Sequence, residues 1–223
     1  MIVTLAQSKG GTGKSMLTLN LAATAAKRGG NVLILDTDPQ KTLTEILALR
    51  AEVAESMKNL STFQASYTVT KDLPTLLPQL EKRYDAIFID TAGFDNGLMW
   101  NTVAASDVVL IPVAHGAADL LTATKMVQKI GQIIASTSLQ ARFVLNRFQP
   151  HLRYTTTYLR DLKTLTDAVP KTKTDIHLRA AYVDCFSYGA GVTEIAAHTQ
   201  AATDMYALYD EIMGLNPNFL ADF

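Results

Sequence analysis

The sequence predicts an α/β protein, with a single doubly wound domain over residues 1–223 and a mostly parallel sheet covered by helices on both faces. Short apolar runs alternate with helix-length segments, which is the order that a parallel sheet requires. Each run ends at a polar residue, and a glycine-rich loop joins the first run to the first helix. No linker rich in proline, glycine or serine divides the chain.

Five apolar runs are predicted to be strands, namely residues 2–6, 32–35, 86–89, 108–113 and 142–145. Runs of this length are typical of central parallel strands, which are buried on both faces. Three helices are predicted from spacing and length, at residues 14–27, 41–49 and 120–134. Ligands of such sheets bind at the carboxyl ends of the strands, so we expect the site among the polar residues that close the runs.

The loop after the first run is typical of a phosphate-binding loop. Residues 8–15 read Ser-Lys-Gly-Gly-Thr-Gly-Lys-Ser, which lacks the first glycine of the strict pattern. The glycines can turn backbone N–H groups toward a phosphate, Lys14 can reach the outer phosphates, and the Ser15 hydroxyl can bind Mg²⁺. A glycine-rich turn with incidental lysines is the alternative. The predicted nucleotide contacts are Lys9, Gly10, Gly11, Thr12, Gly13, Lys14, Ser15 and Met16.

A second lysine, Lys9, lies five positions before Lys14, and residues 9–15 fit the pattern Lys-Gly-Gly-x-Gly-Lys-Ser/Thr. The chain thereby resembles the deviant Walker A ATPases, the family of the ParA partition proteins and the MinD cell-division regulators. The resemblance implies ATP and Mg²⁺ as cofactors and a homodimer that forms around ATP. It also implies that Lys9 crosses to the nucleotide of the second subunit and assists phosphoryl transfer. A solvated loop lysine is the other interpretation of Lys9.

The second run closes with Asp36-Thr37-Asp38-Pro39-Gln40, which matches the Asp-x-Asp-Pro-Gln switch of this family. The resemblance makes Asp38 the residue most closely tied to hydrolysis, and both Asp36 and Asp38 are candidate Mg²⁺ ligands. Asp38 followed by proline is also typical of a helix N-cap, which would serve the helix at 41–49. Lys41 stands where the family usually has glycine, which leaves the shape of the switch open.

Asp90 closes the strongly apolar run at residues 86–89. An unpaired buried carboxylate would be costly, so we expect Asp90 to face Mg²⁺ together with Ser15. The next residues, Thr91-Ala92-Gly93, depart from the proline-rich continuation of partition ATPases and complete an Asp-x-x-Gly pattern as in GTPases. A guanine-reading pattern, Thr-Lys-x-Asp, occurs at residues 172–175, but the segment before it is short and broken by Pro170. We expect this match to be a chance resemblance.

Asn146 and Arg147 follow the run at residues 142–145 and are predicted to contact the nucleotide. The family reads adenine with an asparagine at this position, and a strand-end turn is the alternative role for Asn146. Further along, the order of Arg179, Tyr182, Gly191 and Glu194 fits the loose Arg-x-x-Tyr and Gly-x-x-x-Glu spacing of partition ATPases.

Basic residues outnumber acidic ones by eight to three between residues 142 and 179, although the whole chain has 20 Lys and Arg against 21 Asp and Glu. A basic surface can bind the DNA backbone without reading bases, as a C-terminal face does in the family. A solvated face is the alternative, and Arg179 could instead hold an acidic partner inside the fold. The candidate DNA contacts are Arg153, Arg160, Lys163 and Arg179.

Several absences in the sequence narrow the function. A single cysteine, Cys185, argues against an intrachain disulfide and a multi-cysteine metal cluster. No segment is typical of a signal peptide or a membrane span, and the last ten residues lack the basic residues of the MinD membrane helix. The phosphate loop begins eight residues into the chain, so we expect no preceding helix-turn-helix domain.

The sequence therefore predicts a cytoplasmic, nucleoid-associated ATPase of the small ParA type, without a membrane partner. ATP would drive dimerisation, the dimer would bind DNA non-specifically, and a ParB-like or cargo-bound partner would trigger hydrolysis. An ATPase that positions a protein cargo is the alternative. A GTPase, or an ATP-dependent ligase with the same loop, is a further alternative from another class.

Overall fold

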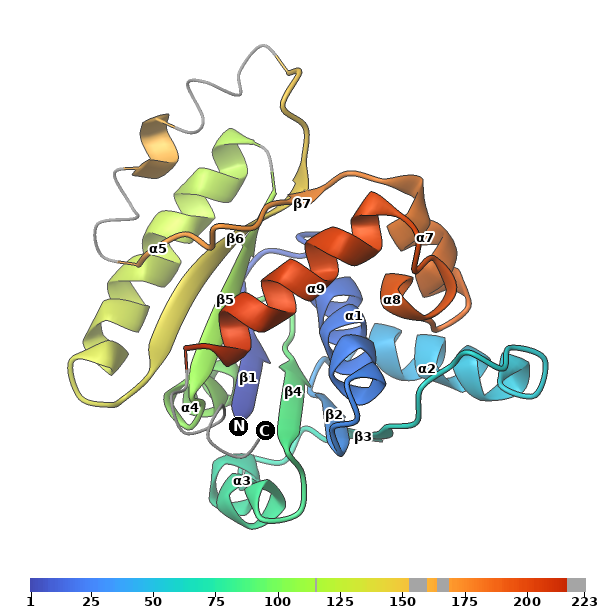
Figure 1. The fold of residues 1–223 in the computed structure, drawn as a ribbon. Coiled ribbons are helices and arrows are strands. Elements are labelled where there is room, and N and C mark those ends of the chain that lie inside the picture. The colour runs from blue at the N-terminus through green and yellow to red at the C-terminus, as the bar shows by residue number, and fades with distance from the viewer. Residues whose placement is uncertain (115, 153–159, 164–168, 216–223) are drawn as a thin grey trace.

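The computed structural model describes residues 1–223 except 115, 153–159, 164–168 and 216–223. Within the described residues, seven strands form one sheet in the order β3-β2-β4-β1-β5-β6-β7, and every neighbouring pair is parallel (Figure 1). The strands are β1 (Ile2–Leu5), β2 (Val32–Asp36), β3 (Gln64–Tyr67), β4 (Ala86–Asp90), β5 (Val108–Val113), β6 (Gln140–Phe148) and β7 (Ile176–His177).

Helices cover both faces of the sheet, which confirms the doubly wound prediction (Figure 1). One face carries α1 (Lys14–Lys27), α2 (Thr42–Val53), α7 (Ala180–Ser187), α8 (Val192–Ile195) and α9 (Gln200–Met213). The other face carries α3 (Leu73–Glu81), α4 (Gly97–Ala104) and α5 (Ala117–Ile134). No helix in the described ranges is long and apolar enough to cross a membrane.

The five predicted strands and three predicted helices are all present, because each carried a strong apolar pattern. β1, β2, β4 and β5 are buried along their whole length, as central parallel strands require. Two strands were not predicted. β3 lies at the edge of the sheet and is built mostly of exposed, polar residues, and β7 is only two residues long.

The order of the strands places the phosphate loop at the switch point of the sheet. β1 lies between β4 and β5, and the chain winds outward in opposite directions on its two sides. Such a reversal opens a crevice at the carboxyl ends of the strands, where ligands of open α/β sheets bind. The loop between β1 and α1 lies in this crevice, next to the ends of β2 and β4.

The Thr-Lys-x-Asp segment at residues 172–175 lies at the edge of the sheet that β7 forms. It precedes β7 and runs beside the middle of β6, where Lys171 and Phe143 form a parallel bridge. The backbone N–H groups of Lys173 and Thr174 donate to the Glu211 carboxylate of α9. The Thr172 N–H donates to the carbonyl of Phe143 in β6. Backbone hydrogen bonds therefore hold this segment between β6 and α9.

Candidate nucleotide-binding site

The phosphate loop presents the N-terminus of α1 to the crevice. Gly11 and Gly13 adopt positive φ angles of 77° and 92°, which is the left-handed conformation that favours glycine. Gly13 is the N-cap of α1, and no side chain caps the first turn. Without a side-chain cap from Gly13, the N–H groups of this turn and the helix dipole are suited to binding an anion.

Lys14 is buried at the start of α1, and its ammonium Nζ lies 3.4 Å from the carbonyl oxygen of Lys9. Burial lowers the pKa of the Lys14 ammonium, while the charges of Asp90 and Asp38 act in the opposite direction. A buried ammonium of this kind is best satisfied by a strongly anionic ligand. The position of Lys14 thus fits its predicted contact with the outer phosphates.

Asp90 ends β4 with a fully buried carboxylate, and neither of its oxygens has a hydrogen-bond partner among the described residues. Burial raises the pKa of the Asp90 carboxyl to about 7, although the nearby Ser15 hydroxyl acts to lower it, and the charge of Asp36 adds a smaller increase. Buried polar atoms without a partner are rare in native structures and call for a ligand that the chain does not supply. A hard cation with oxygen ligands fits this carboxylate and the neighbouring Ser15 hydroxyl.

Asp36, at the end of β2, is buried and holds the segment that follows it. Its Oδ1 accepts from the Asp38 N–H at 3.0 Å, and its Oδ2 accepts from the Thr44 N–H at 2.9 Å and the Thr44 hydroxyl at 2.6 Å. Both oxygens are therefore engaged with the switch segment and with the first turn of α2. The structure gives Asp36 a supporting contact here, alongside the metal-binding role predicted for it.

The interpretation of Asp38 as the N-cap of the next helix is wrong. Helix α2 begins at Thr42, and its N-cap is Lys41. The Asp38 carboxylate accepts instead from the Gln40 N–H, and the Lys41 N–H donates to the Asp38 carbonyl. Asp38 thus belongs to a tight turn ahead of the helix, and its second carboxylate oxygen is not used by that turn.

Lys41 explains why the family usually has glycine at its position. It adopts a left-handed conformation with a φ of 56°, which glycine enters without strain. Its ammonium lies 4.3 Å from the centroid of the Tyr67 ring at the end of β3, a cation–π contact. The switch segment therefore takes a left-handed turn although a lysine occupies this position.

Gly93 brings the loop after β4 against the phosphate loop. A Cβ atom at Gly93 would lie only 2.9 Å from the Cα of Gly10, so a side chain would push the two loops apart. The sequence pattern Asp-x-x-Gly includes this residue. The pattern did not indicate that the close approach of the Gly10 backbone leaves no room for a side chain at Gly93.

Asn146 and Arg147 join β6 to the phosphate loop. Asn146 lies inside β6, paired with Ile176, so the interpretation of Asn146 as a strand-end turn is wrong. Its Nδ2 donates to the Thr12 carbonyl at 2.7 Å, and its buried Oδ1 has no partner among the described residues. Arg147 lies at a register shift with a φ of 56°, and its guanidinium donates to the Gly11 carbonyl at 3.4 Å.

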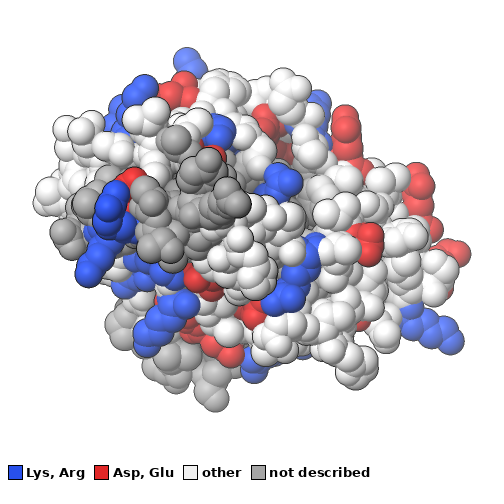
Figure 2. Space-filling model, turned by 90° about the horizontal axis from the view of Figure 1, so that it is seen from above, with Lys and Arg blue, Asp and Glu red and all other residues white. Residues whose placement is uncertain are grey.

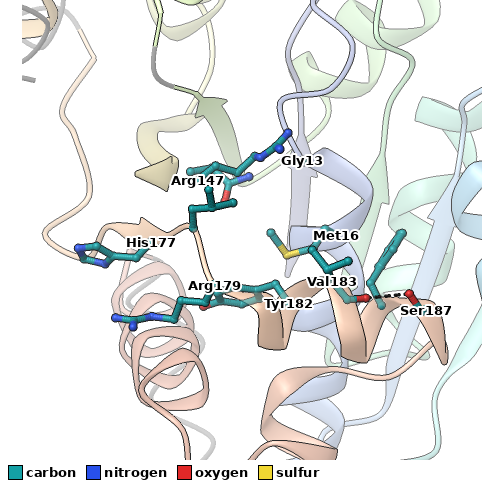
Figure 3. A pocket seen from close by; sticks show the side chains of 11 residues that line it. Gly13, Met16, Arg147, His177, Arg179, Tyr182, Val183 and Ser187 are labelled. Atoms are coloured by element: carbon teal, nitrogen blue, oxygen red, sulfur yellow. Dashed lines mark hydrogen bonds between the residues drawn. The ribbon is translucent and has the colours of Figure 1, made fainter. Parts of the chain in front are cut away.

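A pocket of about 280 Å³ opens beside Gly13 and Asn146 (Figure 3). Part of its wall is apolar and comes from Met16, Leu178, Val183 and Phe186. Figure 3 shows Val183 on α7 next to Met16 on α1, with Ser187 further along α7 and with His177 and Arg179 on the preceding segment. An apolar slot with a few polar groups next to a phosphate loop has the composition of a site for a flat heterocycle. Apart from Met16, the sequence analysis missed these apolar residues, because single apolar residues in a helix are also typical of a core.

Lys9 lies at the rim of the site, and its ammonium forms an ion pair with the Asp119 carboxylate at 2.9 Å. Asp119 belongs to the first turn of α5 and is buried. The sequence analysis did not single out Asp119, because an acidic residue in the first helical turn is common in itself.

The four candidate DNA contacts have different surroundings. Arg153 lies outside the described residues. Arg179 lines the pocket and lies 3.4 Å from the Asp204 carboxylate, which fits the internal ion pair considered for it. Arg160 and Lys163 are exposed. Figure 2, viewed from above Figure 1, shows basic side chains gathered toward one side, with acidic side chains among them.

Comparisons with known proteins agree with this geometry. The family of CobQ/CobB/MinD/ParA nucleotide-binding domains matches residues 3–184. The maintenance of carboxysome distribution protein A of Halothiobacillus neapolitanus is 25% identical over 202 residues, which cover 90% of each chain. The sporulation initiation inhibitor protein Soj of Bacillus subtilis is 30% identical over 167 residues, which cover 57% of this chain and 66% of Soj.

Among solved structures, the septum site-determining protein MinD of Pyrococcus horikoshii, complexed with Mg-ADP, has a similar fold. The TM-score is 0.71 at 19% identity, and the match covers 98% of each chain. The chain therefore belongs to the CobQ/CobB/MinD/ParA family, and within it to the ParA/MinD-type ATPases of partition and positioning.

Proposed function

We propose that this chain is a partition ATPase of the small ParA type, which dimerises on ATP, binds DNA without sequence preference and is released when a cargo-bound partner stimulates hydrolysis. The observation that carries the nucleotide part is the unpartnered, buried Asp90 carboxylate beside Lys14 and Ser15, at the foot of a phosphate loop. A cation at Asp90 and phosphate groups at Lys14 would satisfy both buried charges at once.

Several residues have a defined role toward a bound nucleotide. Ser15 and Asp90 would hold Mg²⁺, which would neutralise charge on the outer phosphates. The MinD structure of Pyrococcus horikoshii contains Mg-ADP, which supports the same pairing in this chain. The free carboxylate oxygen of Asp38 would orient the water that attacks the terminal phosphate, and Asp36 would keep Asp38 in place through the Asp38 N–H.

Adenine is the base that we propose for the pocket beside Asn146. The buried Oδ1 of Asn146 is an unused hydrogen-bond acceptor, and adenine offers an exocyclic amino group as a donor. The guanine-reading pattern at residues 172–175 follows no buried strand among the described residues and is held by backbone contacts with β6 and α9, which argues against a GTPase. We expect ATP to displace a fluorescent ATP analogue at least about tenfold more strongly than GTP. Equal displacement by the two nucleotides would favour the GTPase alternative.

Binding to DNA rests on the exposed basic residues between 142 and 179. Arg160 and Lys163 are the described candidates, and a dimer would double their number. Each neutralised phosphate makes affinity fall as salt rises, so binding should be steeply salt-dependent and insensitive to sequence. A DNA-bound protein of this kind would be located on the nucleoid.

Retardation of unrelated duplexes, with and without ATP, across a salt series tests this part of the proposal. We expect retardation only with ATP, and a loss of at least about tenfold in affinity when Arg160 and Lys163 are both changed to Glu. Charge reversal of the exposed Lys58 serves as the control and should have little effect. Binding to one sequence only, or unchanged binding after reversal at Arg160 and Lys163, would contradict the assignment.

A second candidate is an ATPase that positions a protein cargo. The carboxysome distribution protein of Halothiobacillus neapolitanus supports it, because the match covers 90% of both chains. Absence of DNA binding under every nucleotide condition, combined with ATP hydrolysis, would favour this candidate. Absence of hydrolysis with every candidate partner, combined with ATP-dependent formation of a new bond in a small molecule, would favour the ligase alternative.

A further inference from the structure

Lys9 and Asp119 join two loops that are far apart in the sequence. Lys9 belongs to the phosphate loop after β1, and Asp119 to the first turn of α5 after β5. The Lys9 Nζ lies 2.9 Å from the Asp119 Oδ2, within the range of a charge-assisted hydrogen bond. The Lys9 side chain is 38% exposed, whereas that of Asp119 is only 8% exposed. The ion pair therefore joins a partly exposed lysine, Lys9, to a buried aspartate, Asp119.

Asp119 depends strongly on this lysine. Its Oδ1 is buried and has no hydrogen-bond partner in the part of the chain that the structure describes. Lys9 is the ion-pair partner that the structure gives it. Removing one partner of a buried ion pair leaves an uncompensated charge, which is much more costly than losing an exposed pair. Withdrawal of Lys9 from Asp119 should therefore cost free energy unless another group replaces it.

Exposed apolar side chains lie on the loop after β4 and on α5, the two segments that carry Gly93 and Asp119. Phe94 follows Gly93, whose backbone packs against Gly10, and 49% of Phe94 is exposed. Leu121 lies two residues after Asp119, and 70% of it is exposed. Large apolar side chains that are exposed on these two segments fit a surface that a second copy of the chain would cover.

We propose that Asp119 holds Lys9 within its own subunit, and that this internal ion pair opposes ATP-dependent dimerisation. The inference rests on the proposed function, in which Lys9 crosses to the nucleotide of the second subunit. One ammonium cannot neutralise Asp119 and reach across an interface at the same time. Assembly must break the pair, so Asp119 raises the protein concentration at which the ATP-bound dimer forms.

The substitution Asp119→Asn tests this role, because it keeps the size of the side chain and removes its charge. With Mg²⁺ and a non-hydrolysable ATP analogue, we expect the midpoint concentration for dimerisation to fall at least about threefold. The matched control is Asp210→Asn, which removes an exposed carboxylate paired with Arg28 beyond the far end of α1. An unchanged or higher midpoint for Asp119→Asn in sedimentation equilibrium would overturn the proposal.

Amine labelling tests the ion pair itself and does not depend on dimerisation. In the nucleotide-free wild-type protein, Lys9 should react several times more slowly than the exposed Lys58 toward an acylating reagent. In Asp119→Asn, the labelling of Lys9 should accelerate, whereas that of Lys129, which pairs with Asp95, should stay the same. Equal rates at Lys9 and Lys58 in the wild-type protein would overturn the proposal even if Asp119→Asn does not fold.

The two measurements separate this inference from the proposed function. A wild-type chain that stays monomeric with the ATP analogue, while Lys9 is protected from labelling, would contradict the proposed function. A wild-type chain that dimerises with a midpoint unaffected by Asp119→Asn would contradict only the role of Asp119.

Discussion

At the scale of single residues, two carboxylates separated by one position have different surroundings. Asp36 is buried and uses both oxygens to hold the Asp38 turn and the start of α2. Asp38 is only half-buried, and its turn occupies one oxygen. A group that must contact water in a reaction needs a free oxygen near solvent, which Asp38 has. We therefore propose that Asp36 positions the turn and that Asp38 contacts the attacking water.

We expect Asp38→Ala to keep nucleotide affinity near that of the wild type and to lower the rate of hydrolysis at least about tenfold, because only water orientation is lost. Asp36→Ala is the informative comparison. It should lower both the nucleotide affinity and the rate of hydrolysis, because it releases Thr44 and the whole Asp38 turn. Titration with a fluorescent ATP analogue and a phosphate-release assay measure the two quantities. Hydrolysis by Asp38→Ala at the wild-type rate would mean that Asp38 only shapes the turn.

Gly13 and Gly29 form a natural pair for a test of the phosphate loop. Both have φ angles near 90°, but a Cβ atom at Gly13 would lie 2.1 Å from the Asn146 Nδ2, whereas none lies within 4 Å of one at Gly29. Alanine at either position should lower the free energy of unfolding by about 1–2 kcal/mol through backbone strain. Only Gly13→Ala should also weaken nucleotide binding, by at least about tenfold, because it displaces Asn146. Equal nucleotide affinities of the two variants would contradict this account.

Residue patterns predicted the phosphate loop, Asp38 and Asp90 because their chemistry is local. The glycines, the lysine and the serine are neighbours in the chain, and Asp90 ends a strand whose burial is evident from its apolar run. Asp119 and the apolar pocket wall were missed because tertiary contacts define them. Asp119 acquires its importance from Lys9, which is 110 positions away in the chain, and no local pattern reports such a pairing.

At the scale of elements, a buried ion pair ties α2 to α8. The Arg50 guanidinium binds both oxygens of the Glu194 carboxylate, at 2.8 and 2.7 Å, and Glu194 also accepts from the N–H groups of Ser61 and Gly191. Burial by itself would raise the pKa of Glu194, but the hydrogen bonds and charge of Arg50 and these two N–H groups lower it overall. The spacing of Gly191 and Glu194 in the sequence thus reflects the hydrogen bond between them, next to the ion pair with Arg50.

The lowered pKa of Glu194 predicts how stability depends on pH. The carboxylate contributes stability above the ordinary carboxyl pKa of 4.5, and this contribution is lost as the pH falls through the lower pKa of the folded state. Glu194→Gln should lower the free energy of unfolding by about 3–5 kcal/mol at pH 7, because Arg50 is left without its counter-charge. The difference from the wild type should shrink below pH 4.5.

Urea denaturation across a pH series measures this difference, and Glu52→Gln on the exposed side of α2 is the control. A difference between Glu194→Gln and the wild type that stays constant from pH 7 to pH 3 would contradict the role given to the carboxylate. The control should differ little from the wild type at any pH.

Elements with a strong apolar period were predicted, and elements defined by pairing were not. The bounds of α1 coincide with the predicted range, whereas β3 consists of polar residues at an edge and owes its conformation to its register with β2. β6 is longer than the predicted run. Its ends are partly exposed, so they do not belong to the apolar run from which the strand was predicted. Backbone pairing with a neighbouring strand can hold such residues extended, and sequence periodicity does not record it.

At the scale of the whole molecule, the proposed nucleotide contacts all lie within one chain except that of Lys9, which is paired with Asp119 at the rim of the site. In the proposed function, Lys14 contacts the phosphates of the nucleotide in its own subunit. Lys9 would contribute to phosphoryl transfer by contacting the nucleotide of another subunit. A second subunit facing the same edge would bring that nucleotide within reach. Dimerisation on ATP through Lys9 is therefore the central claim of the proposed cycle.

Light scattering of the wild-type chain and Lys9→Ala, each with Mg²⁺ and a non-hydrolysable ATP analogue, tests that claim most directly. The wild-type mass should double from the 24.3 kDa of one chain when the analogue is added, and the Lys9→Ala mass should stay near that of the monomer. A wild-type chain that remains monomeric, or a Lys9→Ala variant that dimerises equally well, would contradict the central claim.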